Sequence, residues 1–216
     1  MRQFFIRMIT LILGLFLFSA GLVFNINAHI GYASWTVFHD GISNATGISI
    51  GNIAIMVGII LVILVILLKE KVGFGTLFNM VFVGIFLDLI LSLQIIPVAD
   101  NLISGVFMIF TGLFVLSLGT YFYMKTGLGA GPRDSLMVAL TRKTGLPIGL
   151  CRGSIEILVV IAGWKLGGMV GIGTILSALA VGFCIQLTFR LLKFDATKVK
   201  HETINQTYQI LLGNKK

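Results

Sequence analysis

The feature that most constrains the fold of this chain is an internal repeat that runs through nearly all of its apolar part without a gap. A shift of 98 residues, which carries Gly31 onto Gly129, superimposes glycine and hydroxyl residues that lie within and between apolar segments. The matched pairs include Gly14 and Gly112, Ser19 and Ser117, Gly21 and Gly119, Thr46 and Thr144, Gly51 and Gly149, Gly73 and Gly171, Gly75 and Gly173, Thr76 and Thr174, and Gly84 and Gly182. Apolar residues match by chance, whereas an ungapped series of glycines and threonines rarely does. The chain is therefore predicted to be a duplicated unit.

The composition places this duplicated unit in a membrane. Hydrophobic residues make up 57% of the chain and charged residues only 11%, whereas soluble domains carry about a quarter charged residues. A bilayer core about 30 Å thick is crossed by about 20 apolar helical residues, and six such spans are expected. Their approximate limits are Phe4–Phe24, Ile48–Leu68, Phe74–Ile96, Leu102–Tyr123, Ile148–Leu166 and Ile172–Leu192.

Two further segments, Ser34–Thr46 and Arg133–Thr144, have apolar residues at helical spacing but are too short and too polar to span. We expect short amphipathic helices that lie at the membrane or re-enter it. Each unit then holds three spans and one short helix. Because the number of spans is odd, the second unit has the opposite orientation in the membrane. The predicted fold class is an all-α membrane protein with six transmembrane helices in two inverted three-helix repeats. The repeats cover residues 1–98 and 99–193, and a basic tail follows at 194–216.

The distribution of basic residues predicts the orientation, because Lys and Arg near the ends of spans stay on the cytoplasmic side. With the N-terminus inside, the connections Asn25–Gly47 and Pro97–Asn101 lie outside and contain no Lys or Arg, and Lys165 is the one basic residue expected there. Both termini are therefore expected in the cytoplasm. The formal charge of +8 then reflects topology and does not indicate a nucleic-acid partner. The tail from Asp195 either forms a short helix on the inner surface or is solvated and frayed.

The most distinctive stretch is Gly127–Ser135, which reads Gly-Leu-Gly-Ala-Gly-Pro-Arg-Asp-Ser. Glycines at 127, 129 and 131 allow a sharp turn, and Pro132 suits the first position of a helix. The backbone amides could cradle an anion at a helix N-terminus, but the spacing matches neither a dinucleotide fingerprint nor a P-loop. The residues interpreted as architectural are Gly127, Gly129, Gly131, Pro132, Gly171, Gly173 and Thr174. In the external counterpart of this motif, Tyr32 and Trp35 are interpreted as interfacial aromatics.

A charged residue inside a span is costly and therefore points to function. Asp88 lies deep in the third predicted span, and its counterpart in the repeat is Gln186. Two polar residues at equivalent points of an inverted pair could face one another near the midplane and bind substrate or an ion. The alternative is an aspartate that locks helices together through hydrogen bonds.

A second group of candidates is predicted at the cytoplasmic side. Arg152 and Glu156 stand four residues apart, so they share a helix face and can pair. They are interpreted either as a self-neutralising pair or as part of a substrate gate. Arg133 and Asp134 of the glycine-rich motif lie on the same side, and the four charges could form one network.

No catalytic or metal-binding pattern is found in the sequence. His29 and His39 are expected in an external connection, and no two histidines stand at metal-ligand spacing. No span carries a serine, histidine and aspartate set or paired carboxylates. The chain is therefore expected not to be an enzyme and to use neither cofactor nor metal.

The segment Gly127–Leu136, with Thr144, Gly145, Gly149 and the later Gly-Ile-Gly-Thr at 171–174, resembles the YczE/YyaS/YitT family of bacterial membrane proteins, most closely its YczE branch. In that family the motif commonly reads Gly-x-Gly-Pro-Trp-Asp, so Gly131, Pro132 and Asp134 match and Arg133 departs from it. The resemblance implies a multi-pass protein of the bacterial cytoplasmic membrane. It does not imply a particular activity.

Two functions remain open from the sequence. The first is a small secondary transporter that holds a small molecule or ion between the two inverted units. The second is a non-transporting scaffold, assembly factor or regulator, which would act through its polar surface and tail. The expected surroundings are the lipid bilayer, and the sequence is compatible with a homo-oligomer.

Overall fold

The structure, a computed structural model, describes residues 2–211, and this range is helical with short connections. The elements are α1 (Arg2–Asn27), α2 (Ser34–Thr46), α3 (Ile50–Leu67), α4 (Phe74–Leu93), α5 (Leu102–Met124), α6 (Pro132–Thr144), α7 (Ile148–Lys165), α8 (Ile172–Leu191), a 3-10 turn (Ala196–Lys198) and α9 (Ile204–Leu211). Both short segments predicted to be helices are confirmed, as α2 and α6. Pro132 occupies the first turn of α6, as its fixed φ favours.

Five of these helices, α1, α3, α4, α5 and α8, are long and apolar enough to cross a membrane. Helix α7 occupies the predicted span Ile148–Leu166 but is not among them. Its 18 residues include Arg152, Glu156 and Lys165, and charges lower the apolar character of a span. The all-helical membrane class is confirmed, whereas a sixth span is still a prediction.

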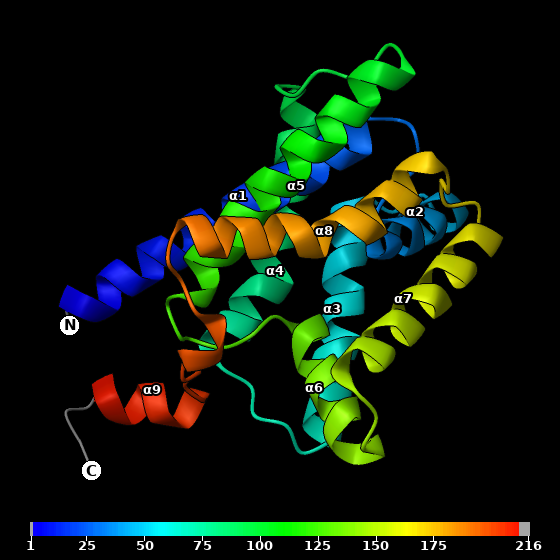
Figure 1. Cartoon of the computed structure of the whole chain (residues 1–216). Helices are drawn as coiled ribbons and strands as arrows, with labels where there is room; N and C mark the ends of the chain where they lie inside the picture. The colour runs from blue at the N-terminus through cyan, green and yellow to red at the C-terminus, as the bar shows by residue number, and fades with distance from the viewer. Residues whose placement is uncertain (1, 212–216) are drawn as a thin grey trace.

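Helices α1 and α5 lie side by side and cross at close range (Figure 1). Glycines occupy the crossing. A Cβ added at Gly21 would lie 2.6 Å from the carbonyl oxygen of Gly112, and one added at Gly14 would lie 2.9 Å from that of Gly119. Small residues let two helix backbones approach, which increases dispersion contacts in an apolar environment. Under the shift of 98 residues, Gly14 corresponds to Gly112 and Gly21 to Gly119. The contact between Gly14 and Gly119 is therefore the counterpart of the contact between Gly112 and Gly21.

The connection before each short helix is anchored on the other half of the chain. The backbone amide of Gly173 donates to the carbonyl of Ile30, and the amide of Gly75 donates to the carbonyl of Leu128, both at 2.7 Å. These two bonds again correspond under the shift of 98 residues. The following residue, Gly31 in one connection and Gly129 in the other, has a φ of 110° and 135°, respectively. Glycine adopts this conformation without the steric cost that a Cβ would bring.

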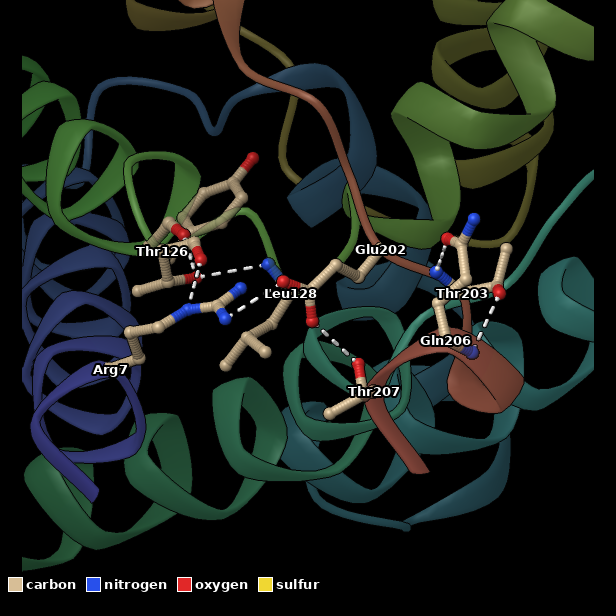
Figure 2. A network of polar contacts seen from close by, with 8 residues as sticks. Arg7, Thr126, Leu128, Glu202, Thr203, Gln206 and Thr207 are labelled. Atoms are coloured by element: carbon tan, nitrogen blue, oxygen red, sulfur yellow. Dashed lines mark hydrogen bonds and ion pairs between the residues drawn. The ribbon is translucent and has the colours of Figure 1, made fainter. Parts of the chain in front are cut away.

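The glycine-rich motif is further held by the chain terminus that follows α8. In Figure 2, Arg7 of α1 donates to the carbonyl of Thr126 at 2.8 Å and forms an ion pair with Glu202 at 2.8 Å. The amide of Glu202 donates to the carbonyl of Gly127 at 2.7 Å. The hydroxyl of Thr207, at the start of α9, donates to the Glu202 carboxylate at 2.9 Å. We call this end of the molecule the N-terminal end, and the end where α1 finishes the distal end.

Of the two alternatives for the tail, the short helix is present as α9, up to Leu211, whereas its place on the inner membrane surface is still a prediction; residues 212–216 lie outside the described residues. The amide of Ile204 donates to the carbonyl of Val72 at 3.2 Å, so the tail also contacts the turn between α3 and α4. Loss of function on removal of the chain after Phe194 would therefore not by itself indicate a binding partner, because the bundle would lose these contacts.

The glycine crossing gives a stability prediction. We expect Gly21→Ala to lower the free energy of unfolding by about 1–3 kcal/mol, because the new methyl group meets the backbone of α5. Gly153→Ala is the matched control, since a Cβ there meets nothing within 4 Å and alanine favours a helix by up to about 1 kcal/mol. Thermal unfolding of the purified proteins in detergent measures both. Equal melting temperatures for the two variants would contradict a close approach of α1 and α5 at Gly21.

Candidate binding cavity between the short helices

A cavity of about 200 Å³ lies between the N-termini of α2 and α6. Its walls come from all eight long and short helices of the bundle, α1 to α8. Most of the wall is apolar, including Leu22, Val57, Met80 and Leu116. The polar groups gather where the two short helices begin. An apolar pocket with a few convergent polar groups is the common form of a small-molecule site.

The two short helices meet through Arg133 and Trp35. The guanidinium carbon of Arg133, in the first turn of α6, lies 4.7 Å from the centre of the Trp35 ring in α2, a cation–π contact. Position 35 corresponds to position 133 under the shift of 98 residues. Arg133 makes no hydrogen bond or ion pair with the described residues. Burial lowers the pKa of Arg133 to about 10, so the guanidinium is charged at neutral pH.

Both short helices begin without a side-chain cap. The residues before them, Ala33 and Gly131, have extended backbones with φ of −63° and −61°, and no side chain of the described residues caps either helix start. The first amides of a helix carry partial positive charge and lack partners within the helix. Two uncapped N-termini therefore face the same cavity.

The acidic residues of the cavity have partners. The hydroxyl of Tyr123 donates to Asp134 at 3.2 Å. Arg152 and Glu156 pair at 3.0 Å, as their spacing predicts, and both line the cavity. The structure therefore brings Arg133, Asp134, Arg152 and Glu156 to one cavity, in which the acidic groups are satisfied and the Arg133 guanidinium is not.

His39 of α2 also lines the cavity and is only 3% exposed. Its Nε2 atom has no hydrogen-bond partner among the described residues. Burial, together with the nearby charge of Arg133, holds the pKa of His39 well below its ordinary value, so the ring is neutral at pH 7. His39 was expected in a loop of an external connection, but it lies in helix α2, buried in the bundle; the side of the membrane on which this connection lies is still a prediction.

Asp88 and Gln186 do not line this cavity. Asp88 accepts hydrogen bonds from the hydroxyl of Ser49 at 2.5 Å and from the amide of Gly51 at 2.8 Å, at the start of α3. This arrangement matches the alternative interpretation of Asp88, an aspartate that joins helices. Gln186 lies on the exposed part of α8. A functional role for either residue is still a prediction.

Sequence reasoning missed Trp35 and His39 as cavity residues. Trp35 was interpreted as interfacial, yet it carries the contact to Arg133. The repeat held a signal for this residue, because position 35 is the counterpart of position 133. For His39 we find no signal in the sequence.

The helical bundle, its apolar surface and its mostly apolar cavity with a few convergent polar groups define a multi-pass membrane protein. Residues 5–190 match the model of a family of unknown function, DUF6198, and the chain belongs to this family. It is 31% identical to the uncharacterised membrane protein YczE of Bacillus subtilis over 81% of each chain, and 34% identical to an uncharacterised protein of Haemophilus influenzae over 76% of this chain and 74% of that one. The uncharacterised protein YyaS of Bacillus subtilis is 24% identical over 81% of this chain and 88% of its own. The predicted YczE-like family is therefore confirmed. No solved structure matches the chain.

The contact between Arg133 and Trp35 gives a second prediction. In a double-mutant cycle of Trp35→Leu and Arg133→Met, we expect a coupling energy of about 0.5–2 kcal/mol in the free energy of unfolding, because the cation lies over the ring away from bulk water. Chemical unfolding in mixed detergent micelles measures it. Additive effects of the two substitutions would contradict a direct interaction.

Proposed function

We propose that this protein is a small secondary transporter made of two inverted three-helix repeats, with α7 as the sixth span and the central cavity as the substrate site. The proposal is supported by the paired contacts between the halves and by the uncapped N-termini that meet at the cavity. Discontinuous elements that point helix N-termini at a central site are typical of secondary transporters.

The observation that carries the proposal is a difference between two equivalent helix pairs. At the distal end, α3 and α4 pack closely. A Cβ added at Gly51 would meet the carbonyl of Gly84, and a Cβ at Gly84 would meet that of Gly51. The hydrogen bond from the amide of Gly51 to Asp88 holds the same contact. This side of the bundle is closed.

The equivalent pair, α7 and α8, is open. In Figure 1 the two helices diverge from their short connection, and they make no comparable packing contact over the described residues. Gly149 and Gly182 correspond to Gly51 and Gly84, yet a Cβ at either position would meet nothing within 4 Å. Gln186, the counterpart of Asp88, is exposed. The same sequence pattern is therefore packed in one half and unpacked in the other.

Two equivalent gates in opposite states are what alternating access requires. In the second state α7 and α8 close through Gly149 and Gly182, and the side-chain oxygen of Gln186 accepts from the amide of Gly149. Closure there accompanies opening of α3 and α4, because the connections before α2 and α6 tie each half to the other. With the N-terminus in the cytoplasm of a bacterial cell, as the basic residues favour, the state described here opens to the cytoplasm.

Disulfide formation between introduced cysteines tests this exchange without knowledge of the substrate. In a background with Cys151→Ala and Cys184→Ala, we expect the Pro147→Cys and Gln186→Cys pair to form an intramolecular disulfide under mild oxidation in membranes, because these positions correspond to Ser49 and Asp88, whose side chains meet in the closed gate. A disulfide needs Cα atoms within about 4.4–6.8 Å, which only the closed form of this gate provides. Mobility on non-reducing gels and mass spectrometry measure it.

Each single variant, labelled with a membrane-permeant maleimide, is the control for folding and reactivity. If both single cysteines react but the pair forms no intramolecular disulfide, the proposed exchange is wrong. A disulfide between two chains would instead show that a second copy covers the opening, and it too would contradict the proposal.

Asp88 gives a prediction for the closed gate. In the same cysteine-free background, Ala54→Cys, which lines the cavity on α3, reports access from outside intact cells through an impermeant maleimide. We expect Asp88→Ala to raise the labelling rate about tenfold or more, because hydrogen bonds to a charged group contribute about 1.5–3 kcal/mol. Gln186→Ala is the matched control at the equivalent position and should not raise the rate. Equal rates in the two variants would show that Asp88 does not hold the gate.

A further inference from the structure

We propose that the cavity binds the carboxylate of a small organic acid, held by Arg133, by Nε2 of His39, by the amides of the first turn of α2 and by those that follow Pro132 in α6. The proposal rests on the proposed function, in that the cavity is taken as the substrate site, and it adds the chemical class of the substrate.

The first argument is the unmatched guanidinium. Arg133 lies over the Trp35 ring and makes no hydrogen bond or ion pair with the described residues. A guanidinium presents five donors in a planar fork that fits the two oxygens of a carboxylate. The face of the guanidinium is taken by the ring, so its edge is what remains for a ligand.

The second argument is His39, which lies on the same wall and has a buried Nε2 without a partner. A buried polar atom without a hydrogen bond is costly, so a partner from a bound molecule is the simplest explanation. His39 lies one helical turn after Trp35, and the two rings are 6.5 Å apart between centres. Nε2 of His39 and the Arg133 guanidinium, both close to Trp35, are therefore two polar groups of the cavity without a partner among the described residues.

The third argument is the sign of the charge. Arg133 and Arg152 are balanced in number by Asp134 and Glu156, and both carboxylates already have partners, Tyr123 and Arg152. The two helix N-termini add partial positive charge, equivalent to roughly half an elementary charge each. The one cavity cation without a counter-ion in contact among the described residues, Arg133, and the free helix amides can only donate, so the field favours an anion.

The fourth argument is the apolar wall, which separates an organic acid from an inorganic anion. Beyond the polar groups the cavity is lined by side chains such as Val57, Leu61, Met80, Val83 and Val181. These residues offer dispersion contacts and no hydrogen bonds, so they favour a hydrocarbon group attached to the carboxylate. Phosphate or chloride would leave this wall in contact with water.

Thermal stabilisation of the full-length protein in detergent tests the proposal, with benzoate and butyrate as probes. At ten times the dissociation constant we expect the melting temperature to rise by about 2–4 °C. Benzamide, butylamine, leucine, chloride and phosphate, at matched ionic strength, should give no comparable rise. In the Trp164→Phe variant Trp35 is the only tryptophan, and its emission should change with benzoate at the same concentrations, because the carboxylate binds the guanidinium that lies over the Trp35 ring.

Arg133→Gln should lose the stabilisation by benzoate and should lower affinity at least tenfold. Arg142→Gln is the matched control, because Arg142 lies in the same helix, pairs with Glu70 and is largely exposed; it should bind benzoate as the unaltered protein does. If Arg133→Gln fails to fold, the comparison of benzoate with benzamide on the unaltered protein decides the question.

Equal stabilisation by benzamide, binding of leucine, chloride or phosphate in place of benzoate, or unchanged binding in Arg133→Gln would overturn the carboxylate assignment. Absence of benzoate binding together with the disulfide between the Pro147→Cys and Gln186→Cys positions would reject the substrate class and leave the transporter proposal standing. Benzoate binding without that disulfide would reject transport and leave the carboxylate site.

Discussion

The cavity depends on two backbone hydrogen bonds that cross between the halves of the chain, from Gly173 to Ile30 and from Gly75 to Leu128. Each bond fixes the connection before a short helix against the hairpin turn of the other half. Backbone groups away from water need partners inside the protein, so such connections are stable only where another part of the chain supplies them. As a result, α2 and α6 begin inside the bundle, and their N-termini face one another. These bonds are what anchors the start of each short helix inside the bundle.

Much of this framework could be predicted from the sequence. The repeat correctly matched Gly73 with Gly171 and Gly75 with Gly173, and these residues make the equivalent contacts in the two halves. The positions of α2 and α6 also followed from spacing, since apolar periodicity and a proline at a helix start are local signals. The local pattern and the ungapped repeat were enough to predict these features, because each connection is short and each of these glycines occupies a position where a side chain would not fit.

The composition of the cavity could not be predicted in the same way. Whether two equivalent residues meet depends on how the halves cross, and sequence spacing does not give that crossing. Trp35 and Arg133 meet in the cavity, whereas Asp88 bonds to the start of α3 in its own half. His39 was misplaced for a related reason. A helix that enters the bundle buries residues that the order of spans would place outside.

The residues at which the two halves differ also bear on the balance between the two proposed states. At the closed gate the Asp88 carboxylate receives two hydrogen bonds, one of them from the Ser49 hydroxyl. At the open gate the equivalents are Gln186, which is uncharged, and Pro147, which has no hydroxyl. Hydrogen bonds to charged groups contribute about 1.5–3 kcal/mol and those between neutral groups about 0.5–1.5 kcal/mol. The two closures therefore differ in energy even though their glycines match. If the proposed exchange occurs, we expect the closure at Asp88 to be the more stable one without ligand, and a substrate would reverse the order only by binding the other state more tightly.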